Sequence, residues 1–167
     1  MSEILPYHIK IAAEAFAAGL LTHAGYDVLI QYEANQPDYD LAIGKRNHTL
    51  TRISVKGTQL AGWTLAGRYV REANYIRAAD EWMHAQSDGL IFFLVSFYEV
   101  PLGTCPDCFV ATPQEIAQQL KSQRGGLGHG SLALKRSPKR GAGAGTIDAV
   151  PETWRFSLAR MNKLMGV

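Results

Sequence analysis

Residues Leu90–Phe97 form an apolar run that is bounded by Gly89 and Pro101. A run of this length without polar alternation is typical of a strand that is buried on both faces of a sheet. Such a strand has to lie inside its sheet, with other secondary structure packed on each side. The run therefore predicts an α/β protein with a mixed central β-sheet and helices on both faces.

Helices are predicted before and after this strand. Residues 8–24 and 69–86 each carry apolar side chains at helical spacing, which predicts one buried stripe on each helix. A third helix is expected to begin at Thr112, because Thr112, Pro113 and Glu115 form the signature of a capping box with proline in the first turn.

Three strands are predicted between the first two helices, at 27–33, 38–43 and 50–58. The second strand alternates strictly between apolar and polar or small residues. A short polar turn at 44–48 separates it from the third strand, so the two are expected to pair as an antiparallel hairpin.

The side chains of this hairpin are expected to segregate by face. In the second strand the two faces carry Tyr39, Leu41 and Ile43 on one side, and Asp38, Asp40 and Ala42 on the other. In the third strand Ser54 and Lys56 share a face, opposite to Ile53 and Val55. A carboxylate from one strand and an ammonium group from its partner can therefore converge beside the sheet.

This combination suits hydrolysis of a phosphodiester. Mg²⁺ prefers oxygen ligands, which a strand aspartate such as Asp40 supplies. A nearby lysine such as Lys56 can orient or deprotonate the attacking water and offset the charge of the transition state. Glu14 borders the buried stripe of the first helix and could face a groove between helix and sheet, although a solvated surface glutamate is the simpler reading of this residue alone.

The order of these features resembles that of the PD-(D/E)XK nuclease superfamily. A helix with Glu14, a strand, the segment 37–40 (Pro-Asp-Tyr-Asp), the segment 53–56 (Ile-Ser-Val-Lys), a helix and a buried strand follow one another over residues 8–115. The resemblance implies a restriction-endonuclease-like fold with an αβββαβ core. It also implies an endonuclease that uses Mg²⁺ or Mn²⁺ and acts on DNA, in many such enzymes as a homodimer.

The resemblance assigns roles to individual residues. Glu14 and Asp40 would bind the metal, with the carbonyl group of Val55 as a further ligand. Lys56 would serve the attacking water, and Gln59 would assist it.

The chain departs from the superfamily pattern at Ser54, where an acidic residue is expected. A hydroxyl group is a weaker and neutral ligand for Mg²⁺. Homing-endonuclease-like and resolvase-like branches resemble this chain in placing a neutral polar residue before Val-Lys. A relocated acid, with Glu33 or Glu72 as candidates, could restore the missing charge.

The segment 121–147 contains no acidic residue and is rich in glycine and cations. Its cluster Lys135, Arg136, Lys139 and Arg140 is predicted to bind the phosphates of a nucleic acid, because glycine lets the chain follow a phosphate backbone. A flexible solubilising loop is the alternative interpretation.

The length of 167 residues predicts one domain over residues 1–167. Lys plus Arg exceed Asp plus Glu by 17 to 15, and a formal charge of +2 is too small to indicate a polyanionic partner by itself. No apolar run approaches the roughly 18 residues of a membrane span, and the first residues lack a secretory signal pattern, so a cytoplasmic protein without a membrane partner is expected.

Two other functions remain open. Ser54 favours a catalytically inactive nucleic-acid-binding module of the same fold. The small net charge favours an interaction or immunity-type protein without nucleic-acid activity. Cys105 and Cys108 could be half of a zinc site, a redox pair or two loop thiols; loop thiols are favoured because no complete set of zinc ligands accompanies them.

Overall fold

A computed structural model describes residues 4–31, 39–46, 49–141 and 143–167. Its larger elements, in chain order, are α1 (Pro6–His23), β1 (Asp27–Ile30), β2 (Leu41–Gly44), β3 (Thr51–Thr58), α2 (Tyr75–His84), β5 (Ile91–Ser96), β6 (Asp107–Ala111), α3 (Pro113–Gly126) and α4 (Leu158–Met165). Shorter elements are β4 (Gly62–Thr64), η1 (Gly67–Tyr69), β7 (Ser131–Ala133), β8 (Lys135–Arg136), β9 (Asp148–Ala149) and η2 (Glu152–Trp154).

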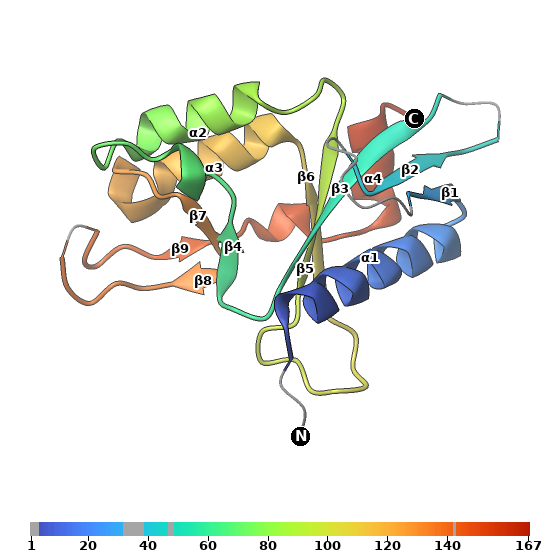
Figure 1. The fold of residues 1–167 in the computed structure, drawn as a ribbon, viewed down its shortest axis with the longest axis horizontal. Coiled ribbons are helices and arrows are strands. Elements are labelled where there is room, and N and C mark those ends of the chain that lie inside the picture. Colours follow the sequence, from blue (N-terminus) through green and yellow to red (C-terminus); the bar gives the residue numbers. More distant parts are fainter. Residues whose placement is uncertain (1–3, 32–38, 47–48, 142) are drawn as a thin grey trace.

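The central sheet is mixed, with the strand order β1-β2-β3-β5-β6. β1, β2 and β3 pair antiparallel, and so do β5 and β6, whereas β3 and β5 are parallel. A parallel pair needs a long crossover connection, and α2 lies within it. The paired ribbons β4-β7 and β8-β9 extend the molecule on the side away from β1 and β2 (Figure 1). The predictions of a mixed α/β sheet and of an antiparallel β2-β3 hairpin are thus confirmed.

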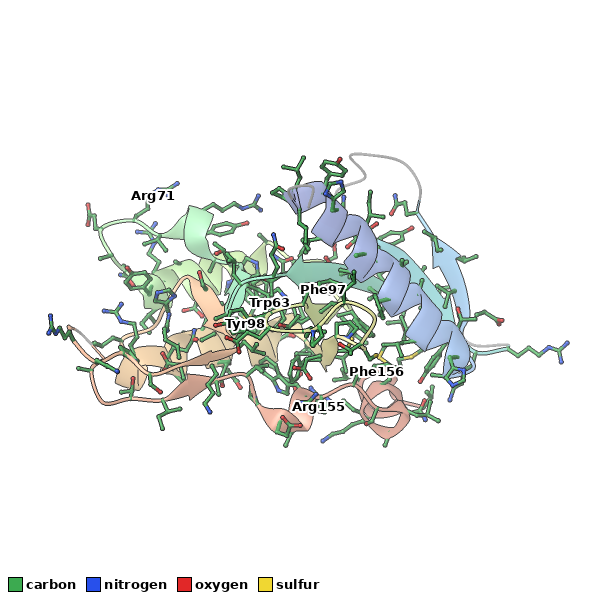
Figure 2. The ribbon with its side chains drawn as sticks, turned by 90° about the horizontal axis from the view of Figure 1, so that it is seen from below. Trp63, Arg71, Phe97, Tyr98, Arg155 and Phe156 are labelled. Carbon is green, nitrogen blue, oxygen red and sulfur yellow. The ribbon has the colours of Figure 1, made fainter. Side chains whose placement is uncertain are left out.

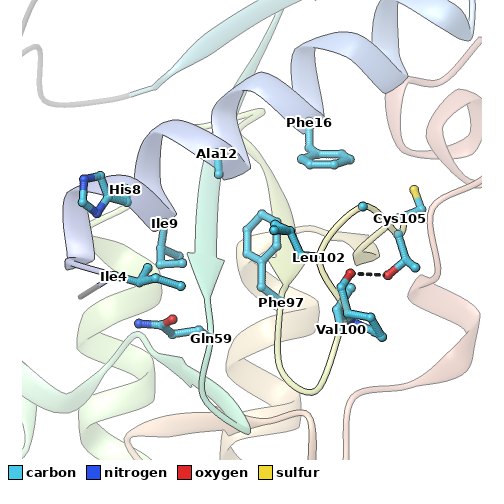
Figure 3. Close-up of a pocket in the computed structure, with 13 residues that line it drawn as sticks. Ile4, His8, Ile9, Ala12, Phe16, Gln59, Phe97, Val100, Leu102 and Cys105 are labelled. Carbon is cyan, nitrogen blue, oxygen red and sulfur yellow. Dashed lines mark hydrogen bonds between the residues drawn. The ribbon is translucent and has the colours of Figure 1, made fainter. Parts of the chain in front are cut away.

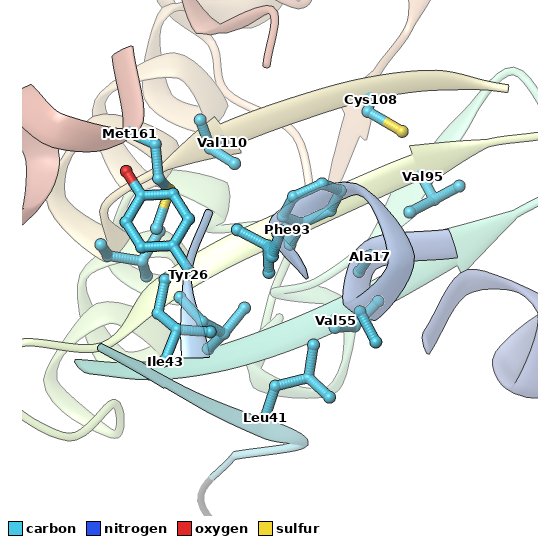
Figure 4. Packing of buried hydrophobic residues seen from close by; sticks show 14 of the residues in the cluster. Ala17, Tyr26, Leu41, Ile43, Val55, Phe93, Val95, Cys108, Val110 and Met161 are labelled. Atoms are coloured by element: carbon cyan, nitrogen blue, oxygen red, sulfur yellow. The ribbon is translucent and has the colours of Figure 1, made fainter. Parts of the chain in front are cut away.

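Alternate residues of β5 pack in two separate hydrophobic clusters. Phe93 and Val95 pack in a first cluster with residues of α1 and α4, part of which Figure 4 shows. Phe92 and Leu94 pack in a second cluster with residues of α2 and α3. All four side chains are fully or almost fully buried. The apolar run is therefore an inner strand covered by helices on both faces, as predicted.

The first helix matches its prediction closely. Proline stands at the first helical position of α1, and the ring nitrogen Nδ1 of His8 accepts a hydrogen bond from the backbone N–H of Leu5. The buried side of the helix includes Ala13, Ala17 and Leu21. Among the described residues, no helix combines the length and the apolar character needed to cross a membrane.

The second helix is shorter than predicted and begins at Tyr75, not at residue 69. Glu72 and Ala73 have positive φ angles of 50° and 56°, which interrupt helical geometry before that point. Asn74 then caps α2, because its side chain accepts a hydrogen bond from the backbone N–H of Arg77. The predicted capping box of α3 at Thr112 is confirmed.

α1 crosses β3 in very close contact at Gly57. A Cβ atom at this position would lie 2.7 Å from the Cβ atom of Ala13 and 2.9 Å from the carbonyl oxygen of Ile9. We expect Gly57→Ala to displace the helix and lower the free energy of unfolding by about 1–3 kcal/mol, measured by urea denaturation. Gly19→Ala is the control, since Gly19 lies in α1 with no atom within 4 Å of an added Cβ, and should stabilise slightly. Equal effects of the two substitutions would contradict the close contact.

Candidate active site

The backbone is irregular at Asp40, immediately before β2. The N–H group of Asp40 donates to the carbonyl oxygen of Ile53 at 2.8 Å, although Ile53 is paired in register with Leu41. The carbonyl oxygen of Asp40 accepts from Gln31 N–H on the opposite side, at 3.1 Å. Two consecutive residues thus oppose one residue of β3, which is the geometry of a β-bulge. Such bulges redirect side chains.

The bulge corrects the predicted arrangement of faces. Leu41 and Ile43 pack in the first cluster, but Tyr39 packs against the second one, so the strict alternation does not continue through residue 39. Asp40 Oδ2 instead accepts a hydrogen bond from the backbone N–H of Val55 at 2.6 Å, with Ser54 Oγ at 3.4 Å. Asp38, the other predicted carboxylate of this strand, lies outside the described residues.

The charge of Asp40 also acts on Glu14 of α1. Its side chain is 24% exposed, and Lys10 Nζ lies 3.7 Å from its Oε1 atom, too far for a good hydrogen bond. Burial raises the pKa of Glu14 above its ordinary value, and the negative charge of Asp40 raises it further. The ammonium groups of Lys10 and Lys56 act in the opposite direction. Asp40 and Lys56 therefore both lie within electrostatic range of Glu14.

The raised pKa of Glu14 has a consequence for stability. In the folded protein this carboxyl binds its proton more tightly than in the unfolded chain, so stability falls as pH rises from the ordinary carboxyl pKa through the raised one. We expect Glu14→Gln to unfold at a higher urea concentration than the wild type at neutral pH in the presence of a chelator. The gain should vanish in acid, below the ordinary pKa.

Urea unfolding at pH values on both sides of this interval tests the expectation. Glu72→Gln is the control, because Glu72 is an exposed residue of the segment before α2. A neutral-pH gain of the same size in both variants would show that burial of Glu14 is not its cause.

Lys56 is the exposed residue at the predicted lysine position of β3. Its backbone is fixed, because its carbonyl oxygen accepts a hydrogen bond from the indole Nε1 of Trp63 at 2.9 Å. Ser54, two residues earlier, is buried at 6% exposure. A long alkyl stem with an exposed ammonium group can reach a bound phosphate or water while its strand stays in place.

Metal-binding potential at this site is limited to a few oxygen atoms. Among the described residues, no group of three or more His, Cys, Asp or Glu side chains is placed to hold a metal ion. Glu14 and Asp40 supply two carboxylates, and further ligands would have to be neutral oxygens. Two side-chain oxygens of the described residues are buried without a hydrogen-bond partner: Glu14 Oε1 and Gln31 Oε1. Glu14 Oε1 has Lys10 Nζ 3.7 Å away, and both oxygens are of the type that hard cations bind.

Gln31 was not recognised in the sequence. It lies inside the strand predicted at 27–33 as an ordinary polar residue, and no motif distinguishes it. Only its backbone pairing with Asp40 places it at the site. Of the two candidates for a relocated acid, Glu33 lies outside the described residues. Glu72 follows Arg71, which Figure 2 shows at the end of the molecule away from α1.

Gln59 lines a different feature, a cavity of about 770 Å³ between the first half of α1 and the segment 97–105 (Figure 3). Ala12 and Phe16 line the same cavity. At about 100° per residue, Glu14 lies about 200° around the helix from each of them, on the opposite flank of α1. The structure thus separates Gln59 from Glu14, and its assistance in catalysis stays a prediction.

The predicted phosphate-binding cluster lies on the β8-β9 ribbon and the segment that joins its strands. Lys135, Lys139 and Arg140 are exposed. Arg136 is instead paired with the buried Asp148, donating to Oδ2 from Nε at 3.2 Å and from Nη2 at 2.7 Å. The same carboxylate accepts the backbone N–H of Arg124 at 2.9 Å. Arg136 therefore holds the ribbon together, whereas the other three cations face solvent.

The two cysteines have different environments. Cys105 is exposed in the loop before β6, but Cys108 is buried inside that strand, so only one of the two is a loop thiol. Burial raises the pKa of Cys108 to about 12. A thiol of this kind is protonated and unreactive at neutral pH.

The candidate site is thus a bulged strand end beside α1, with two carboxylates and a lysine. Its position relative to the sheet comes from the β2-β3 hairpin and the close packing of α1 on Gly57. Comparison with known proteins adds no relative, since no family model, no curated protein and no solved structure matches this chain.

Proposed function

We propose that this protein is a metal-dependent nuclease that hydrolyses phosphodiester bonds in DNA. The observation that supports the proposal is the hydrogen bond of Asp40 to the backbone of Val55, the residue before Lys56, together with the influence of the Asp40 and Lys56 charges on the pKa of Glu14. The order α1-β1-β2-β3-α2-β5 supports a restriction-endonuclease-like fold, because it is the αβββαβ order expected of the PD-(D/E)XK superfamily.

In the proposed reaction each residue has a distinct task. Asp40 and Glu14 would hold Mg²⁺ or Mn²⁺, with the carbonyl oxygen of Val55 as a further ligand. A bound divalent ion would make water a better nucleophile and neutralise charge on the scissile phosphate. Lys56 would orient the attacking water or, as the neutral amine, take its proton, and as the ammonium group it would balance the negative charge of the transition state.

The hydrogen bonds to Asp40 fix its orientation before any ligand binds. Val55 N–H and the Ser54 hydroxyl group both bond to Oδ2. A carboxylate that is already positioned does not have to be ordered at the moment of binding, which favours both affinity and rate.

The exposed cations of the β8-β9 region would contact the phosphates of the substrate. With three contacts, from Lys135, Lys139 and Arg140, affinity should fall about fortyfold between about 50 mM and about 200 mM salt, because each contact releases condensed counterions. Arg136 is not counted, since its guanidinium group is paired with Asp148.

A catalytically inactive DNA-binding module is the second candidate. Ser54 favours it, because this residue stands where an acid is expected and its hydroxyl group points to Asp40 Oδ2 rather than adding a negative charge. Such a module would keep the salt-dependent binding and lack the reaction.

An electrophoretic-mobility and cleavage assay distinguishes the candidates. Purified protein is incubated with linear and supercoiled DNA at two salt concentrations, with a chelator, with Mg²⁺ and with Mn²⁺. Binding together with metal-dependent cleavage supports the nuclease, and salt-dependent binding without cleavage in any metal supports the inactive module. If the protein neither binds nor cleaves DNA, both candidates are overturned, and an interaction protein without nucleic-acid activity remains.

A further inference from the structure

We infer that Gln31 is a ligand of the cation site and that its amide oxygen takes the place of the carboxylate missing at Ser54. The inference rests on the proposed function, because that function gives the cation site its role. The cation binding itself can be measured without any nucleic acid.

The position of Gln31 follows from the pairing of β1 with β2. Ile30 pairs with Leu41, and one step further along the two strands Gln31 N–H donates to the carbonyl oxygen of Asp40 at 3.1 Å. Gln31 and Asp40 are thus neighbours across the β1-β2 pair, although the bulge turns the Asp40 carboxylate toward Val55 of β3. The inferred cation would lie between the amide oxygen and the carboxylate, with ion–oxygen distances of about 2.0–2.6 Å.

The amide oxygen of Gln31 is buried and has no hydrogen-bond donor in the described part of the chain. A buried acceptor without a partner costs about 1–3 kcal/mol and calls for an explanation such as a bound water or ion. Within the described ranges, Glu14 Oε1 is likewise buried without a hydrogen bond, with Lys10 Nζ 3.7 Å away. Both atoms belong to residues that interact with Asp40, one through the backbone and one through its charge.

Ser54 adds no negative charge in place of the missing carboxylate. Its hydroxyl group is oriented toward Asp40 Oδ2 at 3.4 Å, where it acts as a donor to an oxygen that Val55 N–H also contacts. Glutamine oxygen is an accepted ligand of hard cations, although it is neutral. The set Glu14, Asp40 and Gln31 then supplies three oxygen ligands from three different elements, with a total charge of −2.

The charge of this set predicts a weaker site than one with three carboxylates, because ligand charge tunes the affinity for hard cations. Converting the amide to a carboxylate should therefore strengthen cation binding. Removing the oxygen should weaken it. These opposite directions distinguish a ligand from a residue that only supports the fold, since a structural role would make both substitutions unfavourable.

The test measures binding of Mn²⁺ alone by calorimetry at neutral pH. We expect Gln31→Glu to bind Mn²⁺ at least about tenfold more tightly than the wild type, and Gln31→Leu at least about tenfold more weakly. Gln118→Leu is the matched control, because Gln118 is an exposed residue of α3 and should leave binding unchanged. Urea unfolding of each variant shows that it is folded, and Gln31→Leu suffices if the acidic variant does not fold.

Three outcomes are decisive. Opposite shifts in the two Gln31 variants support the inference, even if DNA is never cleaved, in which case only the proposed function fails. Unchanged binding in both variants, with binding lost in Asp40→Asn, overturns the role of Gln31 and leaves the rest of the site. Absence of Mn²⁺ binding by the wild-type protein at millimolar concentration overturns the cation site altogether.

Discussion

Replacement of Asp40 by asparagine is expected to reduce metal-dependent DNA cleavage by at least about a thousandfold, which corresponds to about 4 kcal/mol of activation free energy. Asparagine keeps an oxygen that can accept the hydrogen bond from Val55 N–H, so the bulge should persist while the negative charge is lost. Lys56→Met should reduce cleavage by about a hundredfold or more, because it removes the ammonium group and keeps most of the exposed alkyl stem.

Rates of cleavage in Mg²⁺ and in Mn²⁺, with urea unfolding of the same preparations, test this expectation. Asp88→Asn and Lys163→Met are the matched controls, since both residues are exposed and lie outside the site. Full activity of folded Asp40→Asn, or equal losses in the controls, would remove the basis of the proposed mechanism. Retained DNA binding by an inactive Asp40→Asn variant would show that binding and reaction depend on different parts of the molecule.

Replacement of Asp148 by alanine is expected to lower the free energy of unfolding by about 3 kcal/mol. The Asp148 side chain is 4% exposed and holds both the guanidinium group of Arg136 and the backbone N–H of Arg124. Removing one member of a buried ion pair leaves the other without compensation, which costs more than the pair contributes. The substitution also removes the hydrogen bond to the backbone N–H of Arg124, whose φ of 56° lies in the left-handed region.

Asp107→Ala provides the comparison. Asp107 and Arg155 form an ion pair at 2.7 Å, the same separation as in the pair Arg136–Asp148, but both partners are about half exposed. We expect this substitution to cost less than about 1 kcal/mol, because solvent screens exposed pairs. Urea denaturation measures both values. A cost of Asp148→Ala no greater than that of Asp107→Ala would show that the buried pair does not stabilise the ribbon.

The stability of the β8-β9 ribbon also bears on the proposed binding of DNA. Arg136 was predicted to contact phosphates, yet its guanidinium group is bonded to a buried carboxylate. Asp148 lies just after the acid-free segment, so the composition of that segment gave no sign of the pair. If Lys139 and Arg140 do contact DNA, Asp148→Ala should weaken binding as well, through loss of order in the ribbon that carries them.

Much of the fold could be predicted from the sequence, because hydrophobic periodicity determines which faces must be buried. The apolar run at 90–97 predicted an inner strand with cover on both faces, and the capping box at Thr112 predicted the start of α3. The predicted start of α2 was wrong, because two residues with positive φ interrupt a pattern that looks helical in the sequence. Apolar spacing reports on burial and carries no information about backbone angles of exposed residues.

Some residues of the candidate site could be identified from the sequence, and others only from the structure. Asp40, Lys56 and Glu14 could be identified as candidates because their residue types and strand or helix positions suit metal-assisted hydrolysis. Gln31 could not be identified, since a backbone hydrogen bond to a residue nine positions away and a buried amide oxygen distinguish it only in the folded chain. Gln59 and Arg136 were grouped with the site or with the phosphate contacts, but the structure gives them other neighbours.

The amino-acid sequence by itself determined the alternation of buried and exposed side chains, and with it the mixed sheet, its helical cover and the candidate charges. The tertiary structure alone decided which charges meet. A bulge at Asp40 turns its carboxylate toward Val55, and the absence of a side chain at Gly57 lets α1 approach β3 closely at Ile9 and Ala13. These are contacts between distant segments, and local sequence patterns do not encode them.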